Sequence, residues 1–356
     1  MERRKSREVK IGRVKIGKDN PIAIQSMTFT KTSDKESTLA QIKKLEEAGC
    51  DVVRFSVPDE ECAKNIPYFK EHTDIPLVAD IHFNYKIALA CADYGIDKIR
   101  INPGNIGSDE NIKAVADKCR SKNIPIRIGV NGGSLEKHLL EKYGSPCAEA
   151  LAESAMYHVK LLEKFDFEDI VVSIKSSDVE KAVKANRIFA QMTDYPIHIG
   201  VTEAGTERMG LIKSSIGLGS LLCDGIGDTM RVSLSDDVVK EVEAAKDILS
   251  ALSLRKGVKV VSCPTCSRCN IDVFGTAKRI ENELKNKDWD MTVAVMGCAV
   301  NGPGEAREAD IGVAGGDGKA LLFKKGETVG SIPADKIYEV LLSEAEKLHY
   351  EQISEK

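Results

Sequence analysis

The chain has 356 residues, more than one average domain needs and enough for a (β/α)₈ barrel of about 250 residues with a smaller second domain. Its 51 Lys and Arg against 55 Asp and Glu leave a net charge of −4, without the basic excess that nucleic acid or an anionic membrane attracts. The basic N-terminal segment has no apolar core, and no apolar run approaches the roughly 20 residues of a membrane span. We therefore expect a cytoplasmic protein that binds neither nucleic acid nor membrane.

The first predicted element is a short hairpin, from the repeated Val-Lys-Ile-Gly at Val9 and Val14, which we expect to plug a barrel floor. From residue 22 onward, runs rich in Ile and Val alternate with amphipathic stretches such as Asp34–Ala48 and Asp178–Met192, the pattern of βα units around a parallel sheet. Eight such units favour a closed TIM barrel over an open sheet. The expected strands are Ile22–Met27, Asp51–Val57, Ile75–Ile81, Lys98–Asn102, Ile124–Val130, Ile170–Lys175, Ile197–Val201 and Thr229–Leu234.

The alternation changes after Leu254, where Arg255-Lys-Gly-Val resembles a linker. We expect a barrel domain over residues 1–254 and a smaller α+β domain over residues 255–356. The second domain should contain, in order, a strand (Val258–Ser262), a cysteine loop, a helix (Phe274–Leu284), a strand (Met291–Met296), a glycine-rich loop, two short strands and a last helix (Ala334–Lys347).

Nearly every predicted barrel strand carries polar residues at its C-terminal end, the end where such barrels place their chemistry. A single Arg there is as often part of a surface ion pair as a ligand, but five cations around one mouth are costly unless an anion binds. Two glycine-rich segments, from Asn102 and over Gly217–Asp228, add backbone N–H groups, although neither has the P-loop or dinucleotide pattern. We therefore expect a small ligand with several negative charges, such as a diphosphate. The strand-end residues are Arg54, Asp80, His82, Arg100, Asn102, Arg127, Asn131, Lys175, Thr202, Glu203, Arg231 and Ser233.

Four cysteines near the C-terminus form a metal-binding pattern, whereas the six others are scattered singly as ordinary thiols. Cys263, Cys266 and Cys269 follow a CxxCxxC spacing, and Cys298 lies in Gly297-Cys-Ala-Val-Asn-Gly-Pro-Gly-Glu305. From the spacing alone, a structural Cys₄ zinc site and an iron–sulfur cluster are about equally expected, with a redox disulfide a distant third. The glycine-rich turn before Glu305 favours a reactive cluster, because a structural zinc has no use for a nearby carboxylate.

Motifs along the whole chain resemble those of the 4-hydroxy-3-methylbut-2-enyl diphosphate synthase family. They include Ala79-Asp-Ile-His-Phe, Ile99-Arg-Ile-Asn-Pro-Gly-Asn, Arg127-Ile-Gly-Val-Asn-Gly-Gly-Ser and the two cysteine motifs. The resemblance implies an iron–sulfur oxidoreductase of the non-mevalonate isoprenoid pathway, which reductively opens and dehydrates 2-C-methyl-D-erythritol 2,4-cyclodiphosphate. It also implies a head-to-tail homodimer. An external donor, ferredoxin or flavodoxin, is expected because the chain has no nucleotide-binding fingerprint of its own.

The same resemblance assigns roles to the residues found above. It implies a [4Fe-4S] cluster held by Cys263, Cys266, Cys298 and Glu305, which makes Glu305 a catalytic residue as well as a ligand. It makes Glu203 the candidate proton donor and the remaining strand-end residues the substrate ligands. Cys269 departs from the family pattern, which needs no cysteine at this position. It allows a second ligand set, formed by Cys263, Cys266, Cys269 and Cys298.

Two other functions compete with this interpretation. The first is a barrel lyase or aldolase of phosphorylated substrates with a structural zinc domain, which would be colourless where a cluster protein is brown. The second is a metal-stabilised binding module without catalysis, which does not explain why so many strand ends are polar. A radical enzyme dependent on S-adenosylmethionine is disfavoured, because its CxxxCxxC loop would lie inside the barrel.

Overall fold

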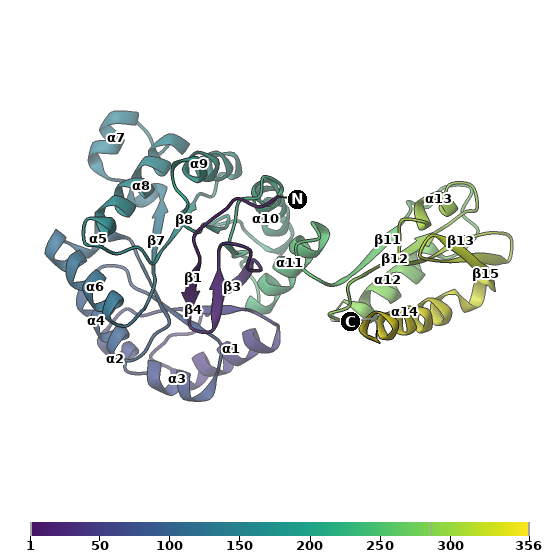
Figure 1. Ribbon diagram of the computed structural model, residues 1–356, viewed down its shortest axis with the longest axis horizontal. Helices are drawn as coiled ribbons and strands as arrows, with labels where there is room; N and C mark the ends of the chain where they lie inside the picture. Colours follow the sequence, from purple (N-terminus) through teal and green to yellow (C-terminus); the bar gives the residue numbers. More distant parts are fainter. Residues whose placement is uncertain (1, 286, 355–356) are drawn as a thin grey trace. The chain divides into compact units, whose positions relative to one another are not determined.

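The computed structural model describes residues 2–285 and 287–354, and for Pro103, Ser134 and Glu305 it describes the backbone alone. These residues form two compact units, one extending to Leu252 and the other beginning at Ser253. Each unit has its own sheet (Figure 1). No helix in the described ranges is long and apolar enough to cross a membrane.

The first unit is a closed barrel of eight parallel strands. The sheet has the order β8-β7-β6-β5-β4-β3-β10-β9, and a parallel bridge between Val172 and Ile197 joins its two edges. This is the (β/α)₈ architecture, so the predicted fold is confirmed. The strands are β3 (Ala23–Met27), β4 (Val52–Ser56), β5 (Leu77–Asp80), β6 (Lys98–Ile101), β7 (Ile126–Asn131), β8 (Ile170–Lys175), β9 (His198–Ile199) and β10 (Thr229–Met230).

Helices form the outer layer of the barrel (Figure 1). Several begin with a side-chain cap, in which Asp34, Asp178 or Asp237 accepts a backbone N–H of the first turn. These caps place each helix start just after the polar loop that leaves a strand. The helices are α1 (Lys35–Glu47), α2 (Glu60–Ala63), α3 (Ile66–His72), α4 (Tyr85–Asp93), α5 (Pro103–Ile106), α6 (Asp109–Ser121), α7 (Lys137–Tyr143), α8 (Ala148–Glu163), α9 (Val179–Met192), α10 (Glu207–Cys223) and α11 (Val238–Ala251).

The predicted hairpin closes the barrel floor. Its strands β1 (Val9–Ile11) and β2 (Val14–Ile16) pair antiparallel. Their buried side chains pack against an apolar layer inside the barrel, made by Ala23, Val52, Val78 and Val171. Gly12, at the hairpin turn, has φ +53°, and a Cβ there would lie 2.8 Å from the Asp97 carboxylate, so the tight approach requires glycine. The apolar layer seals the floor, and a polar ligand must therefore enter from the other end.

The second unit is a five-stranded mixed sheet with the order β11-β12-β13-β14-β15. Helices α12 and α14 pack on one face of the sheet, against Val293 and Val295 of β12 and Val313 of β13. On the other face, Ala294 and Met296 of β12 pack against α13. This alternation gives the unit two small cores. Its elements are β11 (Val258–Ser262), α12 (Val273–Leu284), β12 (Met291–Met296), α13 (Gly302–Ala306), β13 (Ile311–Gly315), β14 (Lys319–Lys324), β15 (Glu327–Pro333) and α14 (Ile337–Ser354).

Two expectations for this unit were wrong in detail. Three strands, not two, follow the glycine-rich loop, because a tight turn at Gly326 adds β15, whose mostly exposed side chains give no apolar signal. The last helix begins at Ile337, after a 3₁₀ turn over Ala334–Lys336, and continues to Ser354.

Candidate functional site

The C-terminal ends of the barrel strands surround a polar cavity of about 210 Å³. All of the predicted substrate-binding residues except Asn102 line it. Gly129, Val130 and Ser173, which the sequence did not single out, complete the lining. The predicted residues of the cavity are Arg54, Asp80, His82, Arg100, Arg127, Asn131, Lys175, Thr202, Arg231 and Ser233.

Two buried carboxylates partly balance the cations of this mouth. Arg100 Nη1 lies 3.0 Å from Asp80 Oδ1, and Arg54 Nε lies 4.0 Å from Asp80 Oδ2. Burial opposes ionisation of Asp80, but the charges of Arg54 and Arg100 hold the pKa of its carboxyl below the ordinary value. On the other side, Arg231 makes two contacts of 3.1 Å with Glu241 of α11. Both carboxylates orient an arginine and leave other guanidinium N–H groups for a ligand.

The charged forms of Arg127 and Lys175 are less well stabilised than those of the arginines paired with carboxylates. Arg127 is 1 % exposed, and its Nη1 donates to the neutral amide oxygen of Gln25 at 3.1 Å. Burial, reinforced by neighbouring cations of the mouth, lowers the pKa of the Arg127 guanidinium and of the Lys175 ammonium well below their ordinary values. Holding these groups together costs free energy that a bound anion would offset, so the electrostatics favour a ligand with several negative charges.

Two glycines make room for the cations. A Cβ at Gly129 of β7 would collide with the guanidinium of Arg100. A Cβ at Gly200 would lie 2.9 Å from Lys175 Nζ and 2.9 Å from the Arg231 carbonyl oxygen. Glycine inside a strand often marks close approach of another group. That signal could have pointed to both positions from the sequence.

Asn102 and Glu203 lie outside the cavity lining. Asn102, 4 % exposed, directly follows β6, and its Oδ1 accepts the Gly104 N–H at 3.0 Å to cap α5. Glu203 is exposed on the loop after β9 and has φ +52°. A glutamate in the left-handed region is uncommon, and such backbone conformations concentrate at functional sites.

Sequence reasoning missed the supporting residues of the mouth. Glu241 lies in the otherwise apolar buried stripe of α11, where a carboxylate is itself a signal. Gln25 and Met27 project from β3, and the Arg54 N–H at Nε contacts Met27 Sδ at 3.0 Å. A methionine at a strand end carries no polar signal, so only the structure identifies it.

The four cysteines of the second unit differ in environment. Cys266 is exposed, Cys263 and Cys269 are half-buried, and Cys298 is 8 % exposed. Within the described side chains, no three Cys, His, Asp or Glu residues come close enough together to hold a metal ion. The side chain of Glu305, the fourth predicted ligand, lies outside the described residues, although its backbone belongs to α13.

The hydrogen bonds of three sulfurs distinguish two predicted cluster ligands, Cys263 and Cys298, from Cys269. Cys263 Sγ accepts the Gly297 N–H at 3.2 Å, and the backbone N–H groups of Asn301 and Val300 lower the pKa of the Cys298 thiol. Both sulfurs therefore accept backbone N–H groups, as the sulfur of an iron-bound cysteine can. Cys269 instead donates its S–H to the Ile271 carbonyl oxygen at 3.1 Å, which suits a protonated structural thiol. The donor chemistry therefore fits an iron–sulfur cluster.

Comparison with protein families decides the identity of the chain. Residues 6–246 match the model of the GcpE TIM-barrel domain, and residues 259–347 match the model of the GcpE protein C-terminal domain. The chain belongs to the GcpE family. A relative from Fusobacterium nucleatum, 55% identical over 95% of this chain and 96% of its own, is named 4-hydroxy-3-methylbut-2-en-1-yl diphosphate synthase (flavodoxin). A relative from Clostridium perfringens with the same name is 53% identical over 96% of this chain and 98% of its own.

A solved structure places the first unit of this GcpE-family chain among barrels of the same fold. The type I 3-dehydroquinate dehydratase of Clostridium difficile matches 69% of this chain and 98% of its own with a TM-score of 0.50. At 16% sequence identity the match concerns the fold alone.

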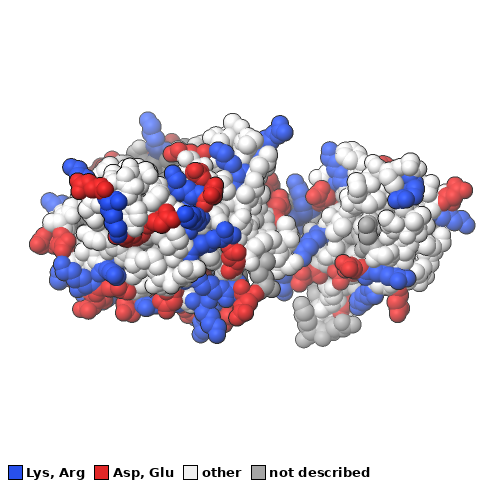
Figure 2. Space-filling view, turned by 90° about the horizontal axis from the view of Figure 1, so that it is seen from above, with Lys and Arg blue, Asp and Glu red and all other residues white. Residues whose placement is uncertain are grey.

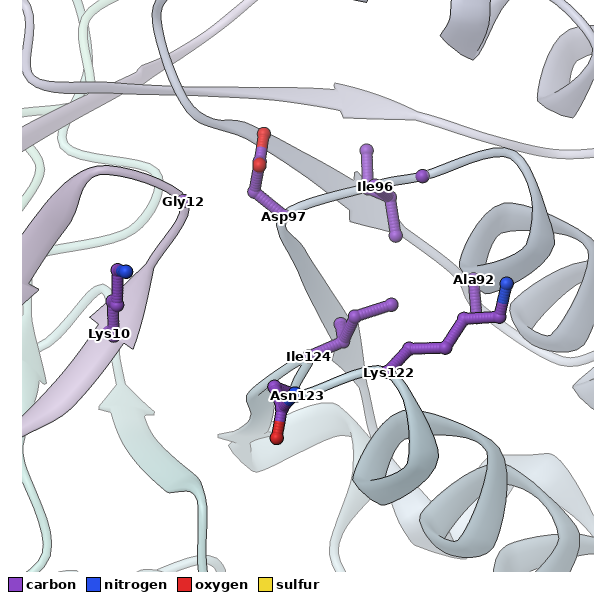
Figure 3. Close-up of a pocket in the computed structure, with 9 residues that line it drawn as sticks. Lys10, Gly12, Ala92, Ile96, Asp97, Lys122, Asn123 and Ile124 are labelled. Carbon is purple, nitrogen blue, oxygen red and sulfur yellow. The ribbon is translucent and has the colours of Figure 1, made fainter.

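A second hollow, beside the barrel floor, is lined by fewer charged side chains than the mouth. The hollow drawn in Figure 3 lies beside Gly12 of the hairpin, and its Asp97 is already held by Lys70 Nζ at 2.6 Å. On the face shown in Figure 2, Lys and Arg are interspersed with Asp and Glu, so no broad patch of one sign appears there. In the mouth, by contrast, several cationic side chains are buried together.

Proposed function

We propose that this chain is an iron–sulfur oxidoreductase that converts 2-C-methyl-D-erythritol 2,4-cyclodiphosphate to 4-hydroxy-3-methylbut-2-enyl diphosphate. The observation that carries the proposal is the buried cationic mouth of a chain that matches synthases of this name over nearly its whole length. The reaction adds two electrons, breaks the bond from the tertiary carbon C2 to its phosphate oxygen and removes the secondary hydroxyl at C3 as water, which requires a proton.

The residues of the mouth bind and orient the diphosphate. Arg100, Arg127 and Lys175 supply charge-assisted N–H donors, of which the arginines fit phosphate oxygens in pairs. Asp80 orients the guanidinium of Arg100, and Glu241 orients that of Arg231. Further polar groups for the ligand come from His82, Asn131, Thr202 and Ser233. Asn102 contributes through the loop that it caps. Because burial makes the empty mouth costly, the bound diphosphate restores charge balance.

Glu203 is the proton donor of this proposal. Glu203 directly follows Thr202 of the mouth in the chain, is exposed and has a left-handed backbone, and these features support the role. The leaving hydroxyl departs as water only when it receives a proton, and the Glu203 carboxyl can deliver it.

Cys263, Cys266, Cys298 and Glu305 would hold the [4Fe-4S] cluster. The N–H groups that face the sulfurs of Cys263 and Cys298 support two of these assignments. When bound, such a cluster supplies electrons one at a time at low potential. We further propose that the barrel, over residues 1–254, binds the substrate and that residues 255–356 carry the cluster.

The external partners follow from the relatives. Because both relatives are named as flavodoxin enzymes, a reduced flavodoxin is the proposed donor, with ferredoxin as the alternative of the same class. The family resemblance supports a head-to-tail homodimer, which sedimentation of the holoenzyme would test.

The deciding experiment combines metal analysis with turnover. Anaerobically purified protein should contain about four iron and four sulfide per chain with a brown absorption band. With reduced flavodoxin, it should consume the cyclodiphosphate and release the linear allylic diphosphate. Stoichiometric zinc without sulfide, or no consumption of the cyclodiphosphate by the iron-loaded protein, would overturn the proposal.

A further inference from the structure

One hydrogen bond crosses the interior of the barrel. Arg127 belongs to β7 and Gln25 to β3, and three strands separate β3 from β7 on either side of the closed sheet. Arg127 Nη1 nevertheless donates to Gln25 Oε1 at 3.1 Å. The guanidinium of Arg127 therefore lies near the barrel axis, where side chains from opposite strands meet in layers.

This contact fixes the direction in which Arg127 points. Both residues are 1% exposed, so water does not compete for the bond. Because a guanidinium has only N–H donors, Gln25 has to present its amide oxygen to it. A hydrogen bond to a charged donor in a dry interior contributes more than one between neutral groups. Gln25 thus holds the guanidinium in place from the opposite wall of the barrel.

The partner of Arg127 is neutral, in contrast to that of another arginine of the mouth. Arg231 makes its contacts of 3.1 Å with the carboxylate of Glu241. Glutamine and glutamate have the same length and differ only in the terminal group, so a carboxylate at position 25 could make the same contact. An amide orients the guanidinium but leaves its positive charge for a ligand, whereas a carboxylate would cancel much of that charge.

The surroundings of Arg127 make the neutral partner unfavourable for stability. Arg127 lines the cavity, where the charges of Arg54, Arg100 and Arg231 act on it and only that of Asp80 is named in opposition. A buried cation among other cations destabilises the fold, and a carboxylate beside it would reduce the effect. Stability alone would therefore favour a glutamate at position 25, whereas binding of an anion favours the amide.

We propose that Gln25 is a positioning residue of the substrate site, which holds the Arg127 guanidinium at the barrel axis without neutralising it and so keeps its charge for the diphosphate. Gln25 acts through Arg127 and is not itself among the residues that line the cavity. The inference rests on the proposed function, because it takes Arg127 as a ligand of the diphosphate. It adds to that function the residue that sets the position and preserves the charge of this ligand.

The first test is Gln25→Glu in the iron-loaded holoenzyme. The carboxylate keeps the size of the side chain and pairs with Arg127, so affinity for the cyclodiphosphate, measured by calorimetry, should fall about tenfold or more. With reduced flavodoxin, KM should rise in parallel while kcat stays within about threefold, since ground-state and transition-state binding weaken alike. The thermal unfolding temperature should not fall, because Arg127 gains an ionic partner.

The matched control adds the same charge outside the mouth. Gln191 is exposed on helix α9 of the outer layer. Gln191→Glu should show wild-type affinity, KM and thermal unfolding temperature, because an exposed charge is well solvated and screened.

A second variant removes the orienting oxygen instead of adding a charge. Gln25→Met keeps the length of the side chain but leaves the buried guanidinium without its acceptor, so the thermal unfolding temperature should fall. Affinity for the cyclodiphosphate should again fall about tenfold, because Arg127 is no longer held in place. The two variants at position 25 thus weaken binding alike and differ in stability. A purely structural glutamine would give an affinity that follows stability.

A double variant tests whether Gln25 acts through Arg127. Once Arg127→Met has removed the guanidinium, adding Gln25→Met should weaken binding by less than about twofold further. The same tenfold loss in this background would show that Gln25 acts on another group, and the inference would be wrong.

The outcomes separate this inference from the proposed function. Wild-type affinity in Gln25→Glu overturns the role of Gln25 whatever the stability of the variant, and this holds even if Gln25→Met does not fold. If iron-loaded wild-type protein neither binds nor consumes the cyclodiphosphate, the proposed function itself fails. Normal turnover by the wild type with unchanged affinity in the variants overturns the positioning role alone.

Discussion

The barrel mouth and the cysteine region hold their proposed ligands by different means. In the mouth, Arg54, Arg100 and Arg127 project from the parallel strands β4, β6 and β7, and the register of the sheet fixes their spacing. Near the cysteines, the sulfurs lie on loops, from exposed Cys266 to buried Cys298. A sheet can hold like charges together against their repulsion, whereas a loop site depends on the group that binds it. The mouth is therefore built by folding, and the cysteine region is expected to be completed by its cofactor.

The largest effect should come from Cys298→Ser, which tests the dependence of the loops on their cofactor. Serine does not replace a thiolate towards iron, so the variant should lose the cluster and all turnover. Because the mouth forms independently, its affinity for the cyclodiphosphate, measured by calorimetry, should remain within about threefold of wild type. A full complement of iron and sulfide in the variant would contradict the ligand assignment.

Glu203→Gln should separate turnover from binding at the mouth. The amide keeps the size of the side chain but carries no transferable proton, so kcat should fall by about 10²–10⁴-fold. The cluster spectrum and the dissociation constant of the cyclodiphosphate should change little. A fall in kcat of less than tenfold would place the proton donor elsewhere.

Two variants compare an arginine that is paired with a carboxylate, Arg231, with one that contacts only a neutral amide, Arg127. Arg127→Met and Arg231→Met should each weaken binding of the cyclodiphosphate by about 1.5–3 kcal/mol, because each removes charge-assisted contacts. Their effects on the free energy of unfolding should differ. Arg231→Met leaves Glu241 buried without its guanidinium and should lower the free energy of unfolding by about 3 kcal/mol. Arg127→Met removes a buried cation held by a neutral amide and should be as stable as wild type or more stable.

Thermal denaturation monitored by circular dichroism would measure both stabilities, with cyclodiphosphate titrations for affinity. If Arg127→Met lowers the free energy of unfolding as much as Arg231→Met does, the charge of Arg127 is balanced within the fold and not by the substrate. Wild-type affinity in both would remove the argument for a diphosphate.

The smallest effect should come from Cys269→Ser. Its S–H donates to the Ile271 carbonyl, a bond that a serine hydroxyl can replace, so cluster content and turnover should remain within about twofold of wild type. Glu305→Ala should instead keep a fragile cluster with little turnover. Loss of the cluster in Cys269→Ser together with normal turnover in Glu305→Ala would reverse the assignment of these two residues.

The sequence by itself determined the barrel, the hairpin plug and the set of polar strand ends. These depend on local signals, namely apolar periodicity and residue type at the end of each strand. It also determined the cysteine spacing. It did not reveal β15, because exposed residues in an edge strand carry no apolar pattern.

Only the tertiary structure decided which groups meet. Asp80 lies between two arginines, Glu241 reaches Arg231 from a helix, and Arg127 reaches Gln25 across the barrel. The tertiary structure also leaves Asn102 and Glu203 outside the cavity lining, although they follow barrel strands as the lining residues do. These pairings depend on strand register and on the tilt of strands around the closed barrel. Because that register involves residues far apart in the chain, no local pattern encodes it.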